Sequence, residues 1–155
     1  MVLSIFYVFT NGKVAKNDLY YNSFVQREVI NVSITAEYNS VNDDSFSFTI
    51  GSDTDSKRLQ IESIVNFFST AIPLSNAPSE EFSISSDCKY FFIFKFNNNY
   101  PDAEFYYSDE YNCIVEKIVY ETEDTEIVDF KYYKVDKNFD KFMNTYNKIQ
   151  PDVIQ

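Results

Sequence analysis

Alternation of apolar and polar residues between positions 29 and 50 constrains the fold of this chain more than any other feature. Ile30, Val32, Ile34 and Ala36 alternate with Asn31, Ser33, Thr35 and Glu37, and Phe46, Phe48 and Ile50 alternate with Ser45, Ser47 and Thr49. A period of two places the apolar side chains of a strand on one face and the polar side chains on the other. The two runs, joined by the polar loop 38–44, therefore predict an antiparallel pair with one solvated face.

A helical period replaces this alternation after residue 53. Apolar residues then follow at helical spacing, at Ile61, Ile64, Val65, Phe68 and Ile72. The pattern predicts a helix over about 54–72, with N-cap candidates in Asp53, Thr54 and Asp55 and with Pro73 as its end. Asp53 and Asp55 could instead bind a divalent cation, but no glycine-rich cation loop follows them, which favours capping.

Further strands and a second helix are predicted from the remaining apolar runs. Lys89–Phe96 is apolar on both faces, which predicts a central strand with a helix over one side. Cys113–Glu121 and Glu126–Val135 predict a hairpin that turns at 122–125. The other predicted elements are strands at 2–9, 13–21, 82–85 and 103–107 and an amphipathic helix at 138–150. We therefore expect an α+β fold, a mainly antiparallel β-sheet with two amphipathic helices (about 54–72 and 138–150), in one globular domain spanning residues 1–155.

Residue types that are rare or absent in the chain exclude several classes of chemistry. There is no histidine, which excludes His-based triads, His-containing zinc sites and the commonest general base near neutral pH. Only two glycines are present, and no glycine-rich phosphate loop can be built from them. Cys88 and Cys113 lie beside strand-like apolar runs and are predicted to be buried, reduced thiols. We expect a protein that is not an enzyme and that uses no cofactor and no metal.

Charge and the first residues bear on the partners and the location. A net charge of -11 opposes binding to duplex nucleic acid or to an anionic membrane, and it attracts basic proteins. The apolar stretch Met1–Phe9 is too short to cross a bilayer and no base precedes it, so a strand is predicted there instead of a signal peptide. A cytoplasmic location is therefore expected. No pattern in the sequence indicates an oligomeric state.

Most of the negative charge is concentrated between Asn98 and Asp129. This window holds ten Asp or Glu residues and one base, Lys117, whereas the rest of the chain holds fourteen acids and twelve bases. Several tyrosines lie within it. One interpretation is a hydrated hairpin whose like charges keep a sheet edge from aggregating. The other is a docking surface, because carboxylates steer a cationic partner while tyrosines supply large, stiff contact area.

The docking interpretation gives the first hypothesis, an immunity or antitoxin-type protein. It would neutralise a basic bacterial toxin, a nuclease above all, by masking the toxin's active site. The residues expected to bind this partner are Tyr106, Tyr107, Asp109, Glu110, Tyr111, Glu121, Glu123, Asp124 and Glu126. One alternative is a phage-encoded anti-defence protein that mimics DNA, which predicts carboxylates spaced along an elongated surface. The other is a small ligand-binding domain or enzyme, which predicts an enclosed cavity lined by Phe and Tyr with a carboxylate inside.

Overall fold

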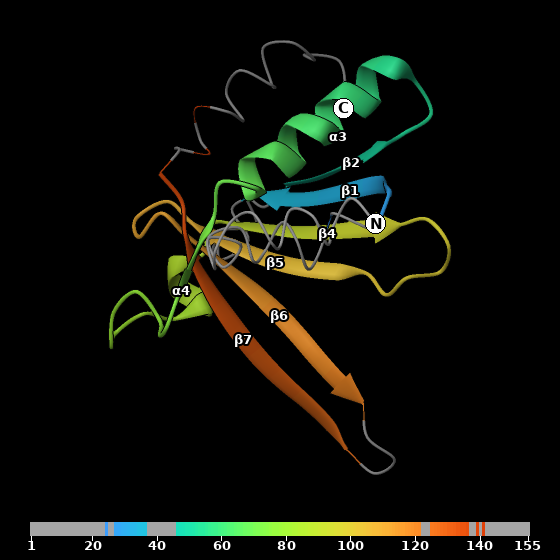
Figure 1. Cartoon of the computed structure of the whole chain (residues 1–155). Coiled ribbons are helices and arrows are strands. Elements are labelled where there is room, and N and C mark those ends of the chain that lie inside the picture. Colours follow the sequence, from blue (N-terminus) through green and yellow to red (C-terminus); the bar gives the residue numbers. More distant parts are fainter. Residues whose placement is uncertain are drawn as a thin grey trace, which may run out of the picture.

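The described part of the chain forms one antiparallel seven-stranded sheet with two helices (Figure 1). The computed structural model describes residues 24, 27–36, 46–121, 125–136, 139 and 141. The elements are β1 (Val29–Ala36), β2 (Phe46–Gly51), α3 (Asp55–Phe68), β3 (Ile72–Leu74), α4 (Ile84–Asp87), β4 (Tyr90–Phe96), β5 (Ala103–Ser108), β6 (Cys113–Glu121) and β7 (Glu126–Lys134). The strand order in the sheet is β2-β1-β4-β5-β6-β7-β3. This arrangement confirms the predicted α+β class with mainly antiparallel β content.

The alternating strands β1 and β2 pair as predicted. Val32, Ile34 and Ala36 are buried, and on the opposite face the hydroxyls of Ser33 and Thr49 lie 2.9 Å apart, within hydrogen-bond distance. Ile30 departs from the pattern, because its side chain is exposed. The pairing of β1 with β4 is irregular between Val29 and Asn31, and Val29 packs against the core in its place.

Strand β4 is interior, as its two apolar faces predict, with β1 and β5 on its two sides. Its even-numbered residues, which include Phe92 and Phe94, are buried beneath α3. Phe68 at the end of α3 places its ring 5.1 Å from the rings of Phe92, Phe94 and Phe105. Edge-to-face contacts of this kind stabilise the core beyond simple area burial.

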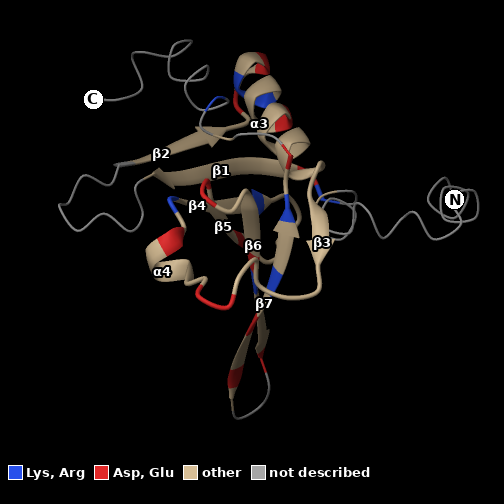
Figure 2. Cartoon of the chain, turned by 90° about the vertical axis from the view of Figure 1, so that its left-hand side faces the viewer, with Lys and Arg blue, Asp and Glu red and all other residues tan. Residues whose placement is uncertain are grey.

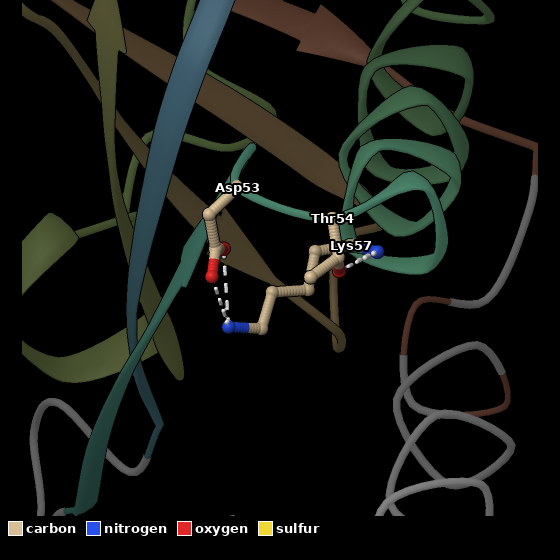
Figure 3. A network of polar contacts seen from close by, with 3 residues as sticks. All are labelled: Asp53, Thr54 and Lys57. Atoms are coloured by element: carbon tan, nitrogen blue, oxygen red, sulfur yellow. Dashed lines mark hydrogen bonds and ion pairs between the residues drawn. The ribbon is translucent and has the colours of Figure 1, made fainter.

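Helix α3 begins with the predicted cap and ends earlier than predicted. Thr54 is the N-cap, and its hydroxyl accepts a hydrogen bond from the Lys57 amide at 3.3 Å, while Asp53 forms an ion pair with the Lys57 ammonium at 3.1 Å (Figure 3). The helix ends at Phe68, because the chain beyond it serves as β3. Pro73 is tolerated there since β3 is the edge strand of the described sheet and pairs with β7 on one side.

The predicted strand at 82–85 is wrong, because this segment contains the short helix α4. The carboxylate of Asp87 accepts a hydrogen bond from the Ser83 amide at 2.7 Å and so satisfies a donor at the helix start. The region around α4 covers the second face of β6 and β7. A small core there contains Cys88, Cys113 and Val115, with Phe82 and Tyr132 packed against it.

Three predicted elements lie outside the described residues, namely the strands at 2–9 and 13–21 and most of the helix at 138–150. Phe139, which falls in the last of these, is helical and buried, and its ring lies 4.8 Å from that of Phe67. Within the described ranges, the helices are too short or too polar to span a membrane.

Candidate functional site

Strands β6 and β7 extend well beyond their neighbours in the sheet. Each has nine residues, but β5 pairs with β6 only from Cys113 to Lys117, and β3 pairs with β7 only from Tyr132 to Lys134. Residues 118–121 and 126–129 therefore pair only with each other among the described residues. We call these two segments the arm, and they project from the body of the molecule (Figure 1).

The arm exposes large apolar side chains on both of its faces. The exposed fractions are 42% for Val119, 49% for Tyr120, 53% for Ile127 and 42% for Val128. Val119 lies opposite Val128, and Tyr120 opposite Ile127, so two apolar cross-strand pairs stand in solvent on opposite faces. Contiguous exposed apolar surface on a soluble protein is typical of an interaction site.

All formal charges on the arm and its tip are negative. Residues 118–129 contain five acids and no base. Glu121 lies directly opposite Glu126 at the end of the ladder, and both side chains are exposed. Like charges in such a pair cost stability. Glu123 and Asp124, which complete the predicted acidic tip, lie outside the described residues. Acidic residues colour the lower part of the hairpin in Figure 2.

The predicted partner-binding residues divide between the two ends of β6. Asp109, Glu110 and Tyr111 lie in the turn that precedes the strand, whereas Glu121 and Glu126 lie at its far end. With a rise of about 3.4 Å per residue in an antiparallel sheet, a nine-residue strand separates its ends by about 27 Å. The predicted set is therefore two separate groups and not one compact surface.

The group at the turn is largely occupied by contacts within the protein. Tyr107 is fully buried against Phe139 and Phe67, so the expectation of a surface anchor at this position is wrong for its ring. Tyr111 is partly buried and packs edge-to-face against Phe82, at 5.3 Å between ring centroids. Glu110 is exposed.

Two further members of this group also contact neighbouring side chains. Tyr106 is partly buried and stacks on Phe91, at 4.8 Å between ring centroids. Asp109 lies 3.6 Å from the Lys89 ammonium, and its side chain is 21% exposed. The turn therefore offers a partner little more than the Glu110 carboxylate.

Carboxylates between the two ends of β6 are bonded across the sheet. Glu104 accepts a hydrogen bond from the Lys117 ammonium at 2.8 Å, and this bond raises the pKa of Lys117. Glu116 accepts one from the Tyr133 hydroxyl at 2.7 Å. On the arm, by contrast, exposed carboxylates and exposed apolar side chains occur together.

Other positions offer little for catalysis within the described ranges. Burial raises the pKa of Cys88 to about 12 and that of Cys113 to about 11, so both thiols are protonated at neutral pH and inert. No three Cys, Asp or Glu side chains in the described segments come together as metal ligands would. A depression of about 380 Å³ between α3 and the start of β1 is lined by charged residues that include Arg27, Arg58 and Glu62. Phe24 is its one aromatic among the described lining residues.

Sequence reasoning placed Glu121 and Glu126 on the arm but missed its four apolar residues. They were assigned to strands, and nothing in a strand pattern distinguishes a paired edge from a projecting one. The projecting end of the hairpin could have been detected from the unequal lengths of the predicted strands. The run at 103–107 has five residues, whereas the two following runs have nine and ten, so the ends of the longer hairpin must lack partners from the shorter strand.

Comparison of the chain with models of protein families, with curated proteins and with solved structures gave no match. The chemistry of the arm must therefore be inferred from its own side chains. Valine, isoleucine and tyrosine can bury apolar area against a partner, and the surrounding carboxylates can pair with cations. An arm of this composition is suited to binding a basic protein.

Proposed function

We propose that this chain is a non-enzymatic, acidic protein that binds a basic protein partner through the arm. The observation that carries the proposal is the exposure of Val119, Tyr120, Ile127 and Val128 beside carboxylates, with no base between residues 118 and 129. Exposed apolar side chains provide the area that becomes buried on binding. The carboxylates accelerate encounter with a cationic surface and disfavour partners of the wrong charge.

In its most specific form the proposal is an immunity-type inhibitor of a bacterial toxin. A nuclease is the class of toxin that fits best, because an enzyme that binds nucleic acid presents a basic active-site surface. The arm would lie across that surface and mask it. Glu121 and Glu126 are the described carboxylates assigned to binding, and Glu123 and Asp124 at the tip are assigned with them.

The two alternatives receive less support from the same residues. A DNA mimic needs a row of available carboxylates, but Glu104 and Glu116 along β5 and β6 are bonded to Lys117 and Tyr133. A small enzyme or ligand-binding domain needs an aromatic pocket with a carboxylate. The depression beside α3 has Phe24 as its one aromatic among the described lining residues, and its lining includes the bases Arg27 and Arg58.

The test is coexpression of the protein with a toxic protein encoded by the neighbouring gene. Wild-type protein should restore growth and should copurify with the toxin. The double variant Glu121→Lys/Glu126→Lys should do neither, because it reverses the charge of the arm while leaving the core untouched. Restored growth with this double variant would contradict the assignment of binding to the arm.

A matched control is available in the turn before α4. Glu80 and Glu81 are both exposed and lie away from the arm, so Glu80→Lys/Glu81→Lys changes the net charge by the same amount. This variant should rescue growth like the wild type. Equal loss of rescue in both double variants would mean that overall charge matters and that the arm has no special part.

A further inference from the structure

The backbone N–H and C=O groups of successive β7 residues point alternately toward β6 and toward the outer edge of the sheet. Two hydrogen bonds show which residues point to each side. The Val135 amide donates to the Asn112 carbonyl at 2.9 Å, on the side of β6. The Phe130 amide donates instead to its neighbour, the side chain of Asp129, at 2.8 Å. Odd-numbered residues of β7 therefore pair with β6, and even-numbered residues point their N–H and C=O groups to the outer edge.

Most of the outer edge of β7 has no partner strand among the described residues. Strand β3 occupies this outer edge only at Tyr132–Lys134, and no described strand occupies it at the remaining six residues, Glu126–Lys131, which pair with β6 on their other side (Figure 2). Three residues of this stretch, Glu126, Val128 and Phe130, direct backbone groups outward. The free edge of β6 is shorter, since only Ile118–Glu121 lies beyond β5.

We propose that the partner binds by adding an extended strand to the outer edge of β7 at Glu126–Lys131, in line with β3. This proposal rests on the proposed function and specifies its mode of recognition. An unpaired edge is a template for strand addition, in which backbone hydrogen bonds give affinity and alternate side chains give specificity. The added strand is a segment of the partner in which two apolar residues lie between two Lys or Arg residues, so that each face of the strand carries a cation.

Charge selects this occupant over a second copy of the chain. Two copies paired along their arms would bring together two segments 118–129, each with five acids and no base. The same charge opposes nucleic acid. Cations on an incoming strand would instead lie beside Glu126 on one face and Asp129 on the other, while its apolar residues would lie beside Val128 and Ile127.

Asp129 occupies one of the outward backbone donors of β7 when no partner is bound. Its carboxylate accepts the Phe130 N–H that would otherwise point into solvent, which blunts the edge against indiscriminate pairing. An incoming carbonyl would take over this donor. The carboxylate would then be released toward a cation of the added strand, so the same side chain protects the free edge and recognises the partner.

The test uses a synthetic peptide with Lys-Val-Val-Lys at its centre, long enough to cover the free edge, and a copy N-methylated along its whole length, which has no backbone donors on either edge. Binding to the full chain is measured by fluorescence anisotropy. We expect the unmodified peptide to bind and the N-methylated peptide, which cannot donate backbone hydrogen bonds to β7, to bind about tenfold more weakly or worse. Equal binding of the two peptides would overturn strand addition.

Two proline variants show whether the peptide binds to the edge of β7 or to that of β6. Val119 and Val128 are cross-strand partners with the same exposure, and their amides point to opposite edges of the arm. Proline is tolerated where an amide faces outward. Val128→Pro should abolish peptide binding and Val119→Pro should preserve it, whereas the reverse result would place the added strand on β6.

The outcomes separate this inference from the function on which it rests. If N-methylation is harmless but Glu121→Lys/Glu126→Lys still abolishes rescue from the toxin, the arm binds a basic partner by another mode and strand addition is wrong. If that double variant rescues growth fully, the proposed function itself fails. Should Val128→Pro unfold the arm, the pair of peptides still decides, because it leaves the protein unchanged.

Discussion

At the scale of single residues, the start of α3 offers a well-defined test of the forces that hold the helix. The Thr54 hydroxyl accepts the amide of Lys57, a donor that no helical carbonyl can reach. Thr54→Ala should therefore lower the free energy of unfolding by about 1 kcal/mol, measured by urea denaturation. Thr54→Ser retains the acceptor and serves as the control. An unchanged midpoint for Thr54→Ala would mean that solvent satisfies this amide equally well.

The same residues explain which parts of α3 could be predicted from the sequence. The cap and the stripe of Ile61, Ile64 and Phe68 are local features, so pattern and capping chemistry were sufficient to identify them. The end of the helix depends on a distant strand. Ile72 continues the helical spacing, but it pairs with Lys134 of β7 instead, and no local signal reports that contact.

At the scale of elements, the pair of like charges at the end of the β6–β7 ladder lowers the stability of the hairpin. Glu121 and Glu126 are directly opposite and exposed, and their repulsion opposes closure of the hairpin. Glu126→Lys replaces the repulsion by attraction and should raise the free energy of unfolding by about 0.2–1 kcal/mol. The same change should weaken binding to the basic partner. The free energy is measured by urea denaturation and the binding by anisotropy.

Glu126→Gln separates the loss of repulsion from the gain of attraction, because it removes the negative charge at position 126 without adding a positive one. Its stability should lie between those of the wild type and Glu126→Lys. A lower stability for Glu126→Lys than for the wild type would mean that the pair is not repulsive in the folded hairpin. A gain in stability together with a loss of binding would instead show that the acidic tip serves recognition and not folding.

The hairpin itself was predicted with nearly correct bounds, whereas α4 was not predicted at all. Residues 113–121 and 126–134 contain dense β-prone runs on either side of a polar turn. The segment around α4 is short and mixed, and its helical turn depends on the bond between the Asp87 side chain and the Ser83 amide. The apolar residue Phe82 suggested the beginning of a strand, but its ring packs edge-to-face against Tyr132 of β7.

At the scale of the whole molecule, the sheet divides the protein into a packed body and a projecting arm. Sequence reasoning located the acidic window but treated it as one surface. Whether two acidic segments lie together depends on strand length and pairing, and β6 holds them about 27 Å apart. Burial also decides whether a predicted binding residue is accessible to a partner. Tyr106 and Tyr107 are adjacent in sequence, yet they face opposite sides of β5, and Tyr107 is fully buried.

The position of the charge on the molecule can be separated from its amount through association rates. Each of the two double variants replaces two Glu by Lys, which changes the net charge from -11 to -7. If the field of the whole protein steered the partner, both variants would associate more slowly by a similar factor. Since the arm is the proposed contact, Glu121→Lys/Glu126→Lys should lose most of the salt dependence of the association rate, and Glu80→Lys/Glu81→Lys should retain it. Stopped-flow measurements of association with the Lys-Val-Val-Lys peptide between low and physiological salt distinguish the two cases. Parallel slopes for the two variants would assign steering to the overall charge, whereas a flat slope for the arm variant alone would assign it to Glu121 and Glu126.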